Sequence, residues 1–570
     1  MKKLSYMIIA ALMAVAGVAQ AANVTNVWDG GGTDGNWGNK TNWVGDAFTI
    51  NSTDHIVFTG SVNTNTFTGA GRNVSSLSFD DNADSNFGIE MAATPGGTNA
   101  PIAFYNAAAI NVATGSTATI RFFGAGNMSI NSNASNPLAN GTGMVINHSG
   151  TGDLRIEKGI SGAAFDVTKN GTGTLTMAPS AANAFTGFKL NDGKVRIGGS
   201  QAATALGALA GTVTLNGGTL SSDSAALRTV AQALVFGGDV TLGNATDTGG
   251  LTFTGNVNLG GAVRTIKTDS NVTLGGVIDN GGLTKAGTGN MAITNANTYA
   301  GATTVKAGLL MVSHSSALGT TAGGTSVSNG ASLRLEGNIN TAENFNIAGA
   351  GYGAVVGALR NFTGTTNTVS GLVTLDANAT IAGDGKLTLS GGVANNKVLS
   401  HSGTVALVAD SAITGSGSIL KNGTGDLTLN ALNTYTGNTT VNNAGSNLLL
   451  TDDAGLTFVI GENGVNNKLT GTGAAVLDGD FYFNLTSAGT TVGDSWTIAS
   501  VSNQTFSSTF TVDGFTDAGS DKWTKAIAGS KFYEFSEGTG VLTVIPEPAT
   551  IGMLGLGAII TLMLRRMRTR

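Results

Sequence analysis

Three charged residues that could act on a carbohydrate alternate along one short segment, Asp153, Arg155 and Glu157. Paired carboxylates cleave glycosidic bonds, and lyase-type sites place acids beside Arg or Lys. On this segment, however, Leu154 and Ile156 would point to one face and the charges to the other. That pattern is ordinary for a strand with one solvated face. We therefore interpret the charges as a solvated surface and keep a polysaccharide lyase or hydrolase as the alternative function.

The four histidines, His55, His148, His314 and His401, show no His-x-x-x-His or Glu-linked zinc spacing. His148 and His401 each begin a His-Ser-Gly-Thr segment that fits the register of a recurring Lys-Asn-Gly-Thr-Gly segment, which predicts that they are scaffold variants of its lysine. The chain has no cysteine, which excludes disulfides, thiolate metal sites and cysteine nucleophiles. We predict no catalytic residue, no metal site and no cofactor, so that the protein is not an enzyme.

The composition favours many short strands joined by tight turns. Among 570 residues there are 86 glycines, and only 11% are charged, well below the ~25% of an average globular chain. So long a chain exceeds what one hydrophobic core needs. The net charge is -6 and the body has no basic block, so we expect no nucleic-acid partner.

One segment occurs three times, beginning at Lys169, Lys285 and Lys421. It reads Lys-x-Gly-x-Gly-x-apolar-x-apolar, continues to Asn-x-Tyr-x-Gly, and ends in Thr-Thr-Val in the later two copies; the first copy has Phe185 in place of Tyr. Alternating apolar residues predict strands with one buried face, and we expect the Gly, Asn and Tyr positions to form turns. The signature positions are Lys169, Gly171, Gly173, Lys285, Gly287, Gly289, Asn297, Tyr299, Gly301, Lys421, Gly423, Gly425, Asn433, Tyr435 and Gly437.

The distance between copies predicts several solenoid turns per repeat, over a repeat-bearing region at 148–450. No proline lies between Pro179 and Pro546, as continuous strand pairing requires. We assign 22–147 to an N-terminal β cap and first turns, and 451–545 to an aromatic-rich C-terminal β domain or cap. Three of the five tryptophans fall in the first region, where they either plug the end of a β-stack, the interpretation we favour, or stack on sugars.

The three copies resemble the autotransporter-associated β-strand repeat of bacterial surface proteins. The resemblance rests on the Lys, Gly, Asn, Tyr and Val positions of the motif and implies a right-handed parallel β-helix in an exported protein. It implies little about activity. A passenger that secretes itself needs a terminal run of alternating ~10-residue strands. The chain ends instead in an apolar segment and arginines, so we do not expect self-secretion.

The first 21 residues have the pattern of a signal peptide. Lys2 and Lys3 precede an apolar run over 7–18, and Ala19-Gln-Ala21 is a small-x-small cleavage site. We therefore expect a signal helix that signal peptidase removes after export.

Residues 546–570 form a second targeting segment. Pro546-Glu547-Pro548 is followed by a mostly apolar run at 551–564 and by a cluster that begins with Arg565 and Arg566. As a helix the run would be about 21 Å long, shorter than the ~30 Å hydrocarbon core, so it predicts a marginal transmembrane anchor with cytoplasmic arginines. The segment resembles the PEP-CTERM sorting signal. The resemblance implies transient anchoring in the inner membrane, recognition by exosortase, removal of the tail, and delivery to the surface or extracellular matrix of a Gram-negative-type bacterium.

Together these features predict an all-β protein with terminal caps, a cleavable signal helix and a short C-terminal membrane helix. We expect it to be a structural protein of the cell surface or matrix. Adhesion and association with extracellular polysaccharide are both left open at this point.

Overall fold

The computed structural model describes residues 25–28, 36–46, 55–58, 65–68, 72–80, 87–91, 102–114, 116, 120–123, 128–131, 143–162, 165–353, 356–547 and 565. The chain divides into two compact units, Met1–Gly323 and Gly324–Arg570, and each is described separately. The prediction of an all-β solenoid is confirmed, since the units together hold about 17 turns of parallel β-solenoid and almost no helix. The right hand of the solenoid stays a prediction. Across the described ranges, no helix has the length and apolarity needed to span a membrane, and the two expected terminal helices lie outside those ranges.

In the described part of unit 1 the regular elements are short strands and three single-turn 3-10 helices, η1 (Lys40–Asn42), η2 (Val44–Asp46) and η3 (Ala202–Thr204). Its strands are β1 (Thr25–Trp28), β2 (His55–Phe58), β3 (Asn65–Phe67), β4 (Arg72–Phe79), β5 (Phe87–Glu90), β6 (Ile102–Val112), β7 (Ile120–Phe123), β8 (Met128–Asn131), β9 (Met144–His148), β10 (Asp153–Ile156), β11 (Ile160–Gly162), β12 (Asp166–Asn170), β13 (Thr174–Met177), β14 (Gly187–Leu190), β15 (Lys194–Ile197), β16 (Thr212–Leu215), β17 (Thr219–Ser222), β18 (Arg228–Val230), β19 (Ala233–Phe236), β20 (Val240–Leu242), β21 (Leu251–Phe253), β22 (Val257–Thr268), β23 (Val272–Leu274), β24 (Ile278–Ala286), β25 (Met291–Ile293), β26 (Thr303–Val305) and β27 (Gly308–Val312).

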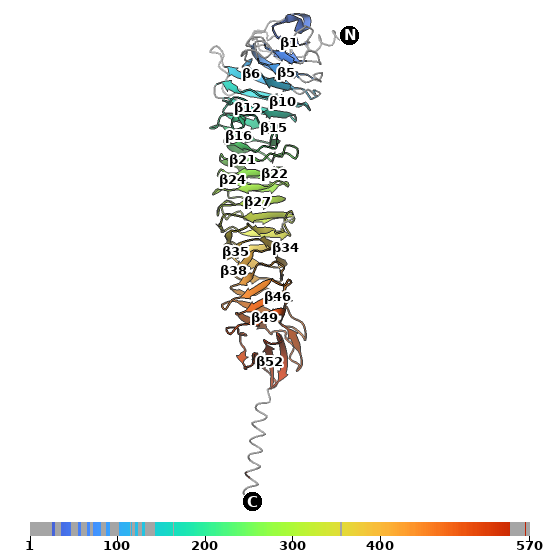
Figure 1. Ribbon diagram of the computed structural model, residues 1–570, viewed down its shortest axis with the longest axis vertical. Coiled ribbons are helices and arrows are strands. Elements are labelled where there is room, and N and C mark those ends of the chain that lie inside the picture. The colour runs from blue at the N-terminus through green and yellow to red at the C-terminus, as the bar shows by residue number, and fades with distance from the viewer. Residues whose placement is uncertain are drawn as a thin grey trace. The chain divides into compact units, whose positions relative to one another are not determined.

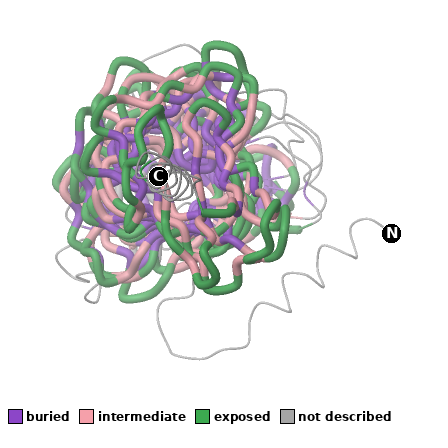
Figure 2. The backbone as a smooth tube through the Cα atoms, turned by 90° about the horizontal axis from the view of Figure 1, so that it is seen from below, coloured by how far each residue is buried: buried purple, intermediate pink, exposed green. Residues whose placement is uncertain are grey.

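The strands of unit 1 stack in parallel ladders, in which most strands pair with a strand of the coil before and a strand of the coil after (Figure 1). One ladder runs β9, β12, β14, β16 and β19, another runs β7, β10, β13, β15 and β17, and a third runs β18, β21, β23, β25 and β27. Parallel pairing aligns like positions of successive coils, so Leu154, Leu175, Val195 and Leu220 lie in one inward column. The alternation seen in the sequence therefore fills one continuous core, with exposed positions facing outward (Figure 2).

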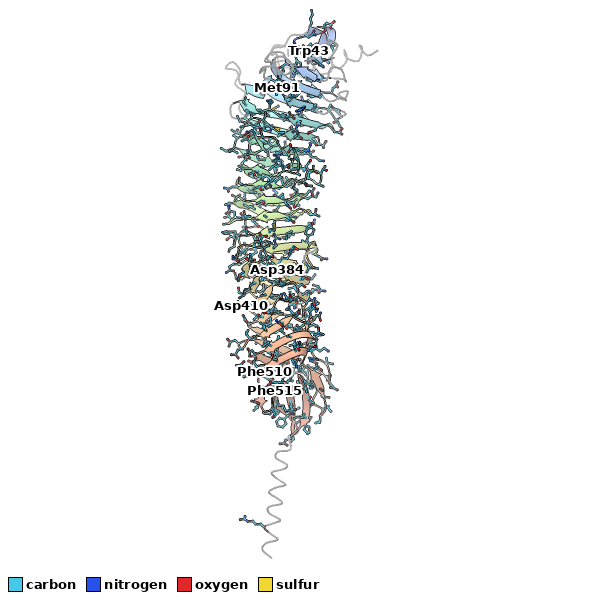
Figure 3. The ribbon with its side chains drawn as sticks, in the orientation of Figure 1. Trp43, Met91, Asp384, Asp410, Phe510 and Phe515 are labelled. Atoms are coloured by element: carbon cyan, nitrogen blue, oxygen red, sulfur yellow. The ribbon has the colours of Figure 1, made fainter. Side chains whose placement is uncertain are left out.

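The tryptophans of unit 1 form a cap over its first strand. Trp28, Trp37 and Trp43 are 0–1% exposed. Trp43 packs edge-on against Trp28 with ring centroids 5.1 Å apart, and Trp37 lies 5.7 Å from Phe58. Trp43 sits at the N-terminal end of the unit (Figure 3). Because the rings are buried, they plug the end of the stack, as predicted, and offer no face to a sugar.

Unit 2 continues the same kind of structure and then changes to an antiparallel sheet. Its strands are β28 (Thr325–Val327), β29 (Ala331–Leu335), β30 (Asn340–Thr341), β31 (Phe345–Gly349), β32 (Leu359–Asn361), β33 (Thr366–Val369), β34 (Val373–Gly383), β35 (Lys386–Leu389), β36 (Val393–Ala394), β37 (Val398–His401), β38 (Ala406–Ala409), β39 (Ile413–Thr414), β40 (Ser418–Lys421), β41 (Leu427–Leu429), β42 (Leu432–Asn433), β43 (Thr439–Val441), β44 (Asn447–Leu450), β45 (Gly455–Val459), β46 (Leu469–Leu477), β47 (Asp480–Asn484), β48 (Ser495–Thr497), β49 (Ala499–Phe506), β50 (Thr516–Asp517), β51 (Lys522–Ile527), β52 (Lys531–Ser536) and β53 (Val541–Pro546).

The C-terminal part of unit 2 is a five-stranded sheet in the order β48-β53-β52-β51-β50. Its Phe535 packs against Phe481 and Phe510, with ring centroids 5.7 and 6.1 Å away, which joins the sheet to the last solenoid coils. Phe510 and Phe515 mark this end of the unit in Figure 3. The region is therefore an antiparallel sheet packed on these coils, and β53 is its last strand.

Candidate functional site

The motif lysines are core residues. Lys169, Lys285 and Lys421 lie on β12, β24 and β40, and all three are fully buried. Each stands in an inward column, and the stem of Lys285 is stacked between Ile266 and Val305 of the neighbouring coils. The alternation that places apolar residues inside thus also places the lysine inside, where its four methylenes pack as an apolar side chain.

The ammonium group of each motif lysine is held by main-chain carbonyls of the following Gly-rich turn. Lys285 Nζ donates to the oxygens of Ala286, Gly287 and Ala307 at 3.0, 2.8 and 2.9 Å. Lys169 Nζ donates to Gly171 O at 2.6 Å, and Lys421 does the same to Gly423. Burial lowers the pKa of each lysine to about 8. The lysines therefore act as internal staples that donate to buried main-chain carbonyls. At the third copy Gly423 O also accepts from Ser446 Oγ at 2.5 Å.

The motif asparagine joins three successive coils. Asn297 Oδ1 accepts from the Ile278 N–H at 2.8 Å, and its Nδ2 donates to Ala317 O at 2.6 Å. Asn183 and Asn433 make the equivalent bonds, and all three are buried. Asn297 lies in the segment 294–302 that connects β25 to β26, and its side chain bonds to the neighbouring coils there; the sequence did not predict these bonds.

The motif tyrosine lies in the same connecting segment, and its side chain is part of the core. Tyr299 is fully buried, and its hydroxyl lies 2.7 Å from Thr303 Oγ1. Two different constraints require glycine at the motif's glycine positions. Gly287 has a φ of 76°, which favours glycine, whereas a Cβ on Gly289 would come within 2.3 Å of Ser270 O in the preceding coil. Only the first is the turn requirement predicted from the sequence.

The two histidines of the repeat register behave differently. His401 pairs directly with Lys421 of the next coil, which confirms that it stands at the lysine position. His148 does not, because Ile146 is the residue opposite Lys169. Both are fully buried, and each has a ring nitrogen on the carbonyl four residues later, at 3.0 Å for His148 and 2.8 Å for His401. Burial and a neighbouring lysine lower both pKa values to about 4, so the rings are neutral at pH 7.

The charged segment of β10 belongs to a larger outward-facing cluster on unit 1. Glu157 accepts from Arg121 at 2.7 and 2.8 Å and from Arg155 at 2.8 Å. The other ion pairs link Arg155 to Asp223 (3.8 Å), Arg196 to Asp153 (3.9 Å), Arg196 to Asp247 (2.8 Å) and Arg228 to Asp223 (2.6 Å). Parallel register creates this cluster, since Arg121, Arg155, Thr176 and Arg196 occupy one outward column.

The pKa values of the two carboxylates of this segment shift in opposite directions. Burial raises the pKa of Asp153, against a hydrogen bond from Thr176 at 2.7 Å. Burial also pushes the pKa of Glu157 upward, but the hydrogen bonds from Arg121 and Arg155 outweigh it and leave that pKa lowered. The residues lie four positions apart along one extended segment, roughly 13 Å at ~3.3 Å each. Glycosidase carboxyl pairs are about 5–9.5 Å apart, so this pair does not fit that chemistry.

A groove of about 380 Å³ lies beside the cluster. Its lining residues are Arg121, Phe123, Glu157, Lys158, Ala178, Ser180, Gly199 and Ser200. The Arg121 guanidinium carbon is 4.9 Å from the centre of the Phe123 ring. Sequence reasoning missed the groove, because its residues come from four coils whose lengths differ. Within the described ranges, no group of three or more His, Asp or Glu side chains could hold a metal ion.

An asparagine ladder on the surface of unit 1 was likewise not expected. Four side-chain bonds of 2.7–2.9 Å connect Asn216, Asn191, Asn170, Asn147 and Asn111 in that order, each Nδ2 donating to the next Oδ1. Asn170, Asn191 and Asn216 each follow the last inward residue of a strand, whereas Asn111 and Asn147 each precede a further buried residue, so no common sequence position marks the ladder. These asparagines bond to one another, so we interpret the ladder as a structural link between successive coils.

The predicted processing residues fall mostly outside the described residues, namely Ala19, Ala21, Pro548 and Arg566. Pro546 is the last residue of β53 and pairs with Lys531. The Glu547 N–H donates to Ser530 O at 2.9 Å. Arg565 is exposed. The folded sheet thus extends to the first two residues of the Pro-Glu-Pro segment.

Comparison with known proteins identifies the three motif copies. Residues 167–197, 283–312 and 419–446 match the family model described as the passenger-associated-transport-repeat. No curated protein and no solved structure matches the chain. The matches support autotransporter-associated β-strand repeats, and with the β-solenoid they fit a secreted, autotransporter-like passenger or surface protein. They point to an exported, cell-surface protein of Gram-negative type.

Proposed function

We propose that this protein is an exported structural β-solenoid of the bacterial cell surface or extracellular matrix. The observation that carries the proposal is the use of the motif's polar side chains. Lys285 binds carbonyls of its own turn, Asn297 bridges coils, and Tyr299 bonds inside the core. Because the Lys, Asn and Tyr of the repeat all bond within the scaffold, the repeat extends the solenoid and does not supply side chains for a reaction centre. Passenger domains built on this repeat are generally structural or adhesive.

The delivery step in this proposal is sorting by exosortase. Signal peptidase removes 1–21, the apolar helix holds the chain in the inner membrane for a time, and exosortase removes the tail at the Pro546-Glu547-Pro548 segment. The tail sequence supports this order, and so does the position of Pro546 at the end of β53. A cut just beyond this strand would leave the sheet's pairing intact, so the body could be released or transferred in folded form.

Replacing Pro546-Glu547-Pro548 with Ala-Gln-Ala tests the sorting step. We expect the variant to keep its C-terminal mass and to fractionate with the inner membrane, whereas the parent chain loses the tail and leaves that membrane. Thr539→Ala, in an exposed turn of the same sheet, is the matched control and should be processed normally. Equal mature mass and equal release of variant and parent chains, measured by intact-mass spectrometry and fractionation, would refute exosortase sorting.

Polysaccharide cleavage is the alternative function. Its support is the charge cluster around Glu157, which lies beside a groove. Against it stand the separation of Asp153 and Glu157 and the arginine bonds that hold Glu157 ionised. Reducing ends or unsaturated products from a panel of glycans incubated with the purified chain would establish the alternative, and their absence leaves the structural role.

A further inference from the structure

We propose that the groove beside Arg121 binds a carboxylate-bearing sugar, as a unit of an acidic polysaccharide. Its volume of about 380 Å³ falls in the ~300–1,000 Å³ range of small-ligand sites. It combines an arginine, a lysine, an aromatic ring and two hydroxyls, which are the groups that recognise the charge, the ring and the hydroxyls of such a sugar. Binding would be a property of the folded chain itself and does not depend on how the chain is delivered.

Arg121 is a prearranged donor for an incoming carboxylate. Its Nε and Nη2 donate side-on to the two oxygens of Glu157, and its guanidinium lies over Phe123. A guanidinium has five N–H donors, so this arrangement leaves the Nη1 end unused by Glu157. The side chain is 53% exposed. Because Glu157 and Phe123 already fix the plane of the guanidinium, a second carboxylate meets it with little loss of side-chain entropy.

Lys158 adds a second positive charge to the groove. It lines the groove and forms no ion pair with any of the residues that the structure describes. Glu157, the one acid in the lining, is shared by Arg121 and Arg155. The lining therefore carries one net positive charge in a chain whose total is -6, which favours an anionic ligand at this place.

The remaining lining residues suit a sugar ring better than a simple anion. Ala178 and Gly199 have small or no side chains, so the groove that they line together with Lys158 stays open. Ser180 and Ser200 are exposed hydroxyls on successive coils, and Phe123 supplies an apolar ring at the same groove. A phosphate ion would use the two cations alone. A uronate uses the cations for its carboxylate, the serines for its hydroxyls and the phenyl ring for its C–H face.

Isothermal titration calorimetry of the purified full-length chain with tri-galacturonic acid tests the proposal. We expect saturable binding that weakens with added salt, and no binding of the carboxyl-reduced neutral trisaccharide. Arg121→Gln should weaken binding about tenfold or more, since hydrogen bonds to charged groups are the stronger ones. Lys194→Gln is the matched control, because Lys194 is exposed on β15 of the same ladder and does not line the groove. It should bind as the parent chain does.

Ser200→Trp separates a shaped site from general attraction to charge, because it fills the groove and changes no charge. We expect it to abolish binding while thermal unfolding stays at the parent value, which also shows that the variant folds. No binding of the trisaccharide, equal binding by Arg121→Gln or Ser200→Trp, or equally strong binding of inorganic phosphate would each overturn the proposal. None of these results bears on the sorting variant, so the two proposals fail independently.

Discussion

Lys285→Met is expected to loosen the coil that contains it. The thioether fills nearly the same volume as the lysine stem between Ile266 and Val305, so little cavity forms. What disappears is the set of three bonds from Nζ to main-chain oxygens at 2.8–3.0 Å. A buried acceptor left without a partner costs about 1–3 kcal/mol, so three of them cost roughly 3–9 kcal/mol.

An opposing effect reduces that loss. Burial lowers the pKa of Lys285 from 10.5 to about 8, which corresponds to about 3 kcal/mol against keeping the charge inside at neutral pH. The methionine removes this penalty. The net destabilisation is therefore about 3 kcal/mol at pH 7. Because a repeat protein of this length need not unfold in one step, the effect is best measured locally.

Native-state hydrogen exchange with mass spectrometry measures this local stability. We expect the amides of β24 and β26 to exchange about a hundredfold faster in Lys285→Met, since ~1.4 kcal/mol is a factor of ten. Lys306→Met is the control, because Lys306 is exposed immediately after β26. Its exchange should stay within a few-fold of the parent. Unchanged or slower exchange in Lys285→Met would show that the carbonyl bonds are worth no more than the burial penalty, and the staple interpretation would be wrong.

Two further variants test other buried polar groups. Asn297→Ala removes the bonds to the Ile278 N–H and to Ala317 O, so hydrogen exchange should show that the local stability falls by about 2–4 kcal/mol. The control Asn271→Ala replaces an exposed side chain and should change exchange little. Equal protection in both variants would contradict the bridging role. Burial raises the pKa of Glu343 to about 7, so the folded state holds a proton that the unfolded state loses near pH 4.5, and stability falls as pH rises between these values. Glu343→Gln should therefore be more stable than the parent by about 3 kcal/mol at pH 8, with a higher unfolding temperature there, and should unfold at the same temperature as the parent at pH 4. Exposed Glu462→Gln should match the parent at both pH values. A parent-like midpoint at pH 8 for Glu343→Gln would refute the assignment.

The sequence was sufficient to predict the strands and their buried faces. Leu175 and Met177 alternate with threonines, and both are fully buried in β13. Period-two alternation survives in each coil because every coil fills the same core. The absence of proline from 180 to 545 fits the continuous ladders. These features are local, so they can be read from neighbouring residues.

The roles of the motif's polar residues could not be read in the same way. Asn297 is eight positions after Gly289, the nearest turn glycine that precedes it in the motif, and asparagine favours turns. Its actual partners are 19 and 20 residues away. These bonds exist only when three coils are stacked, so local propensity does not reveal them. The same reason explains why His401 was placed correctly and His148 was not, since their segments look alike and only strand register separates them.

The surface cluster shows the limit of sequence reasoning most clearly. Arg121 and Arg155 are 34 positions apart, yet they are direct neighbours across the ladder, whereas Arg155 and Thr176 are 21 apart and equally close. Because coil length varies, no fixed spacing reveals which outward residues will meet. The inward positions tolerate this variation, since any coil that keeps its alternation fills the core. The outward positions do not, so a longer or shorter coil changes which charges face each other. A solenoid of this kind can therefore keep one scaffold motif while its insertions create new surfaces, and the groove beside Arg121, bounded by coils of unequal length, is where such a surface has formed.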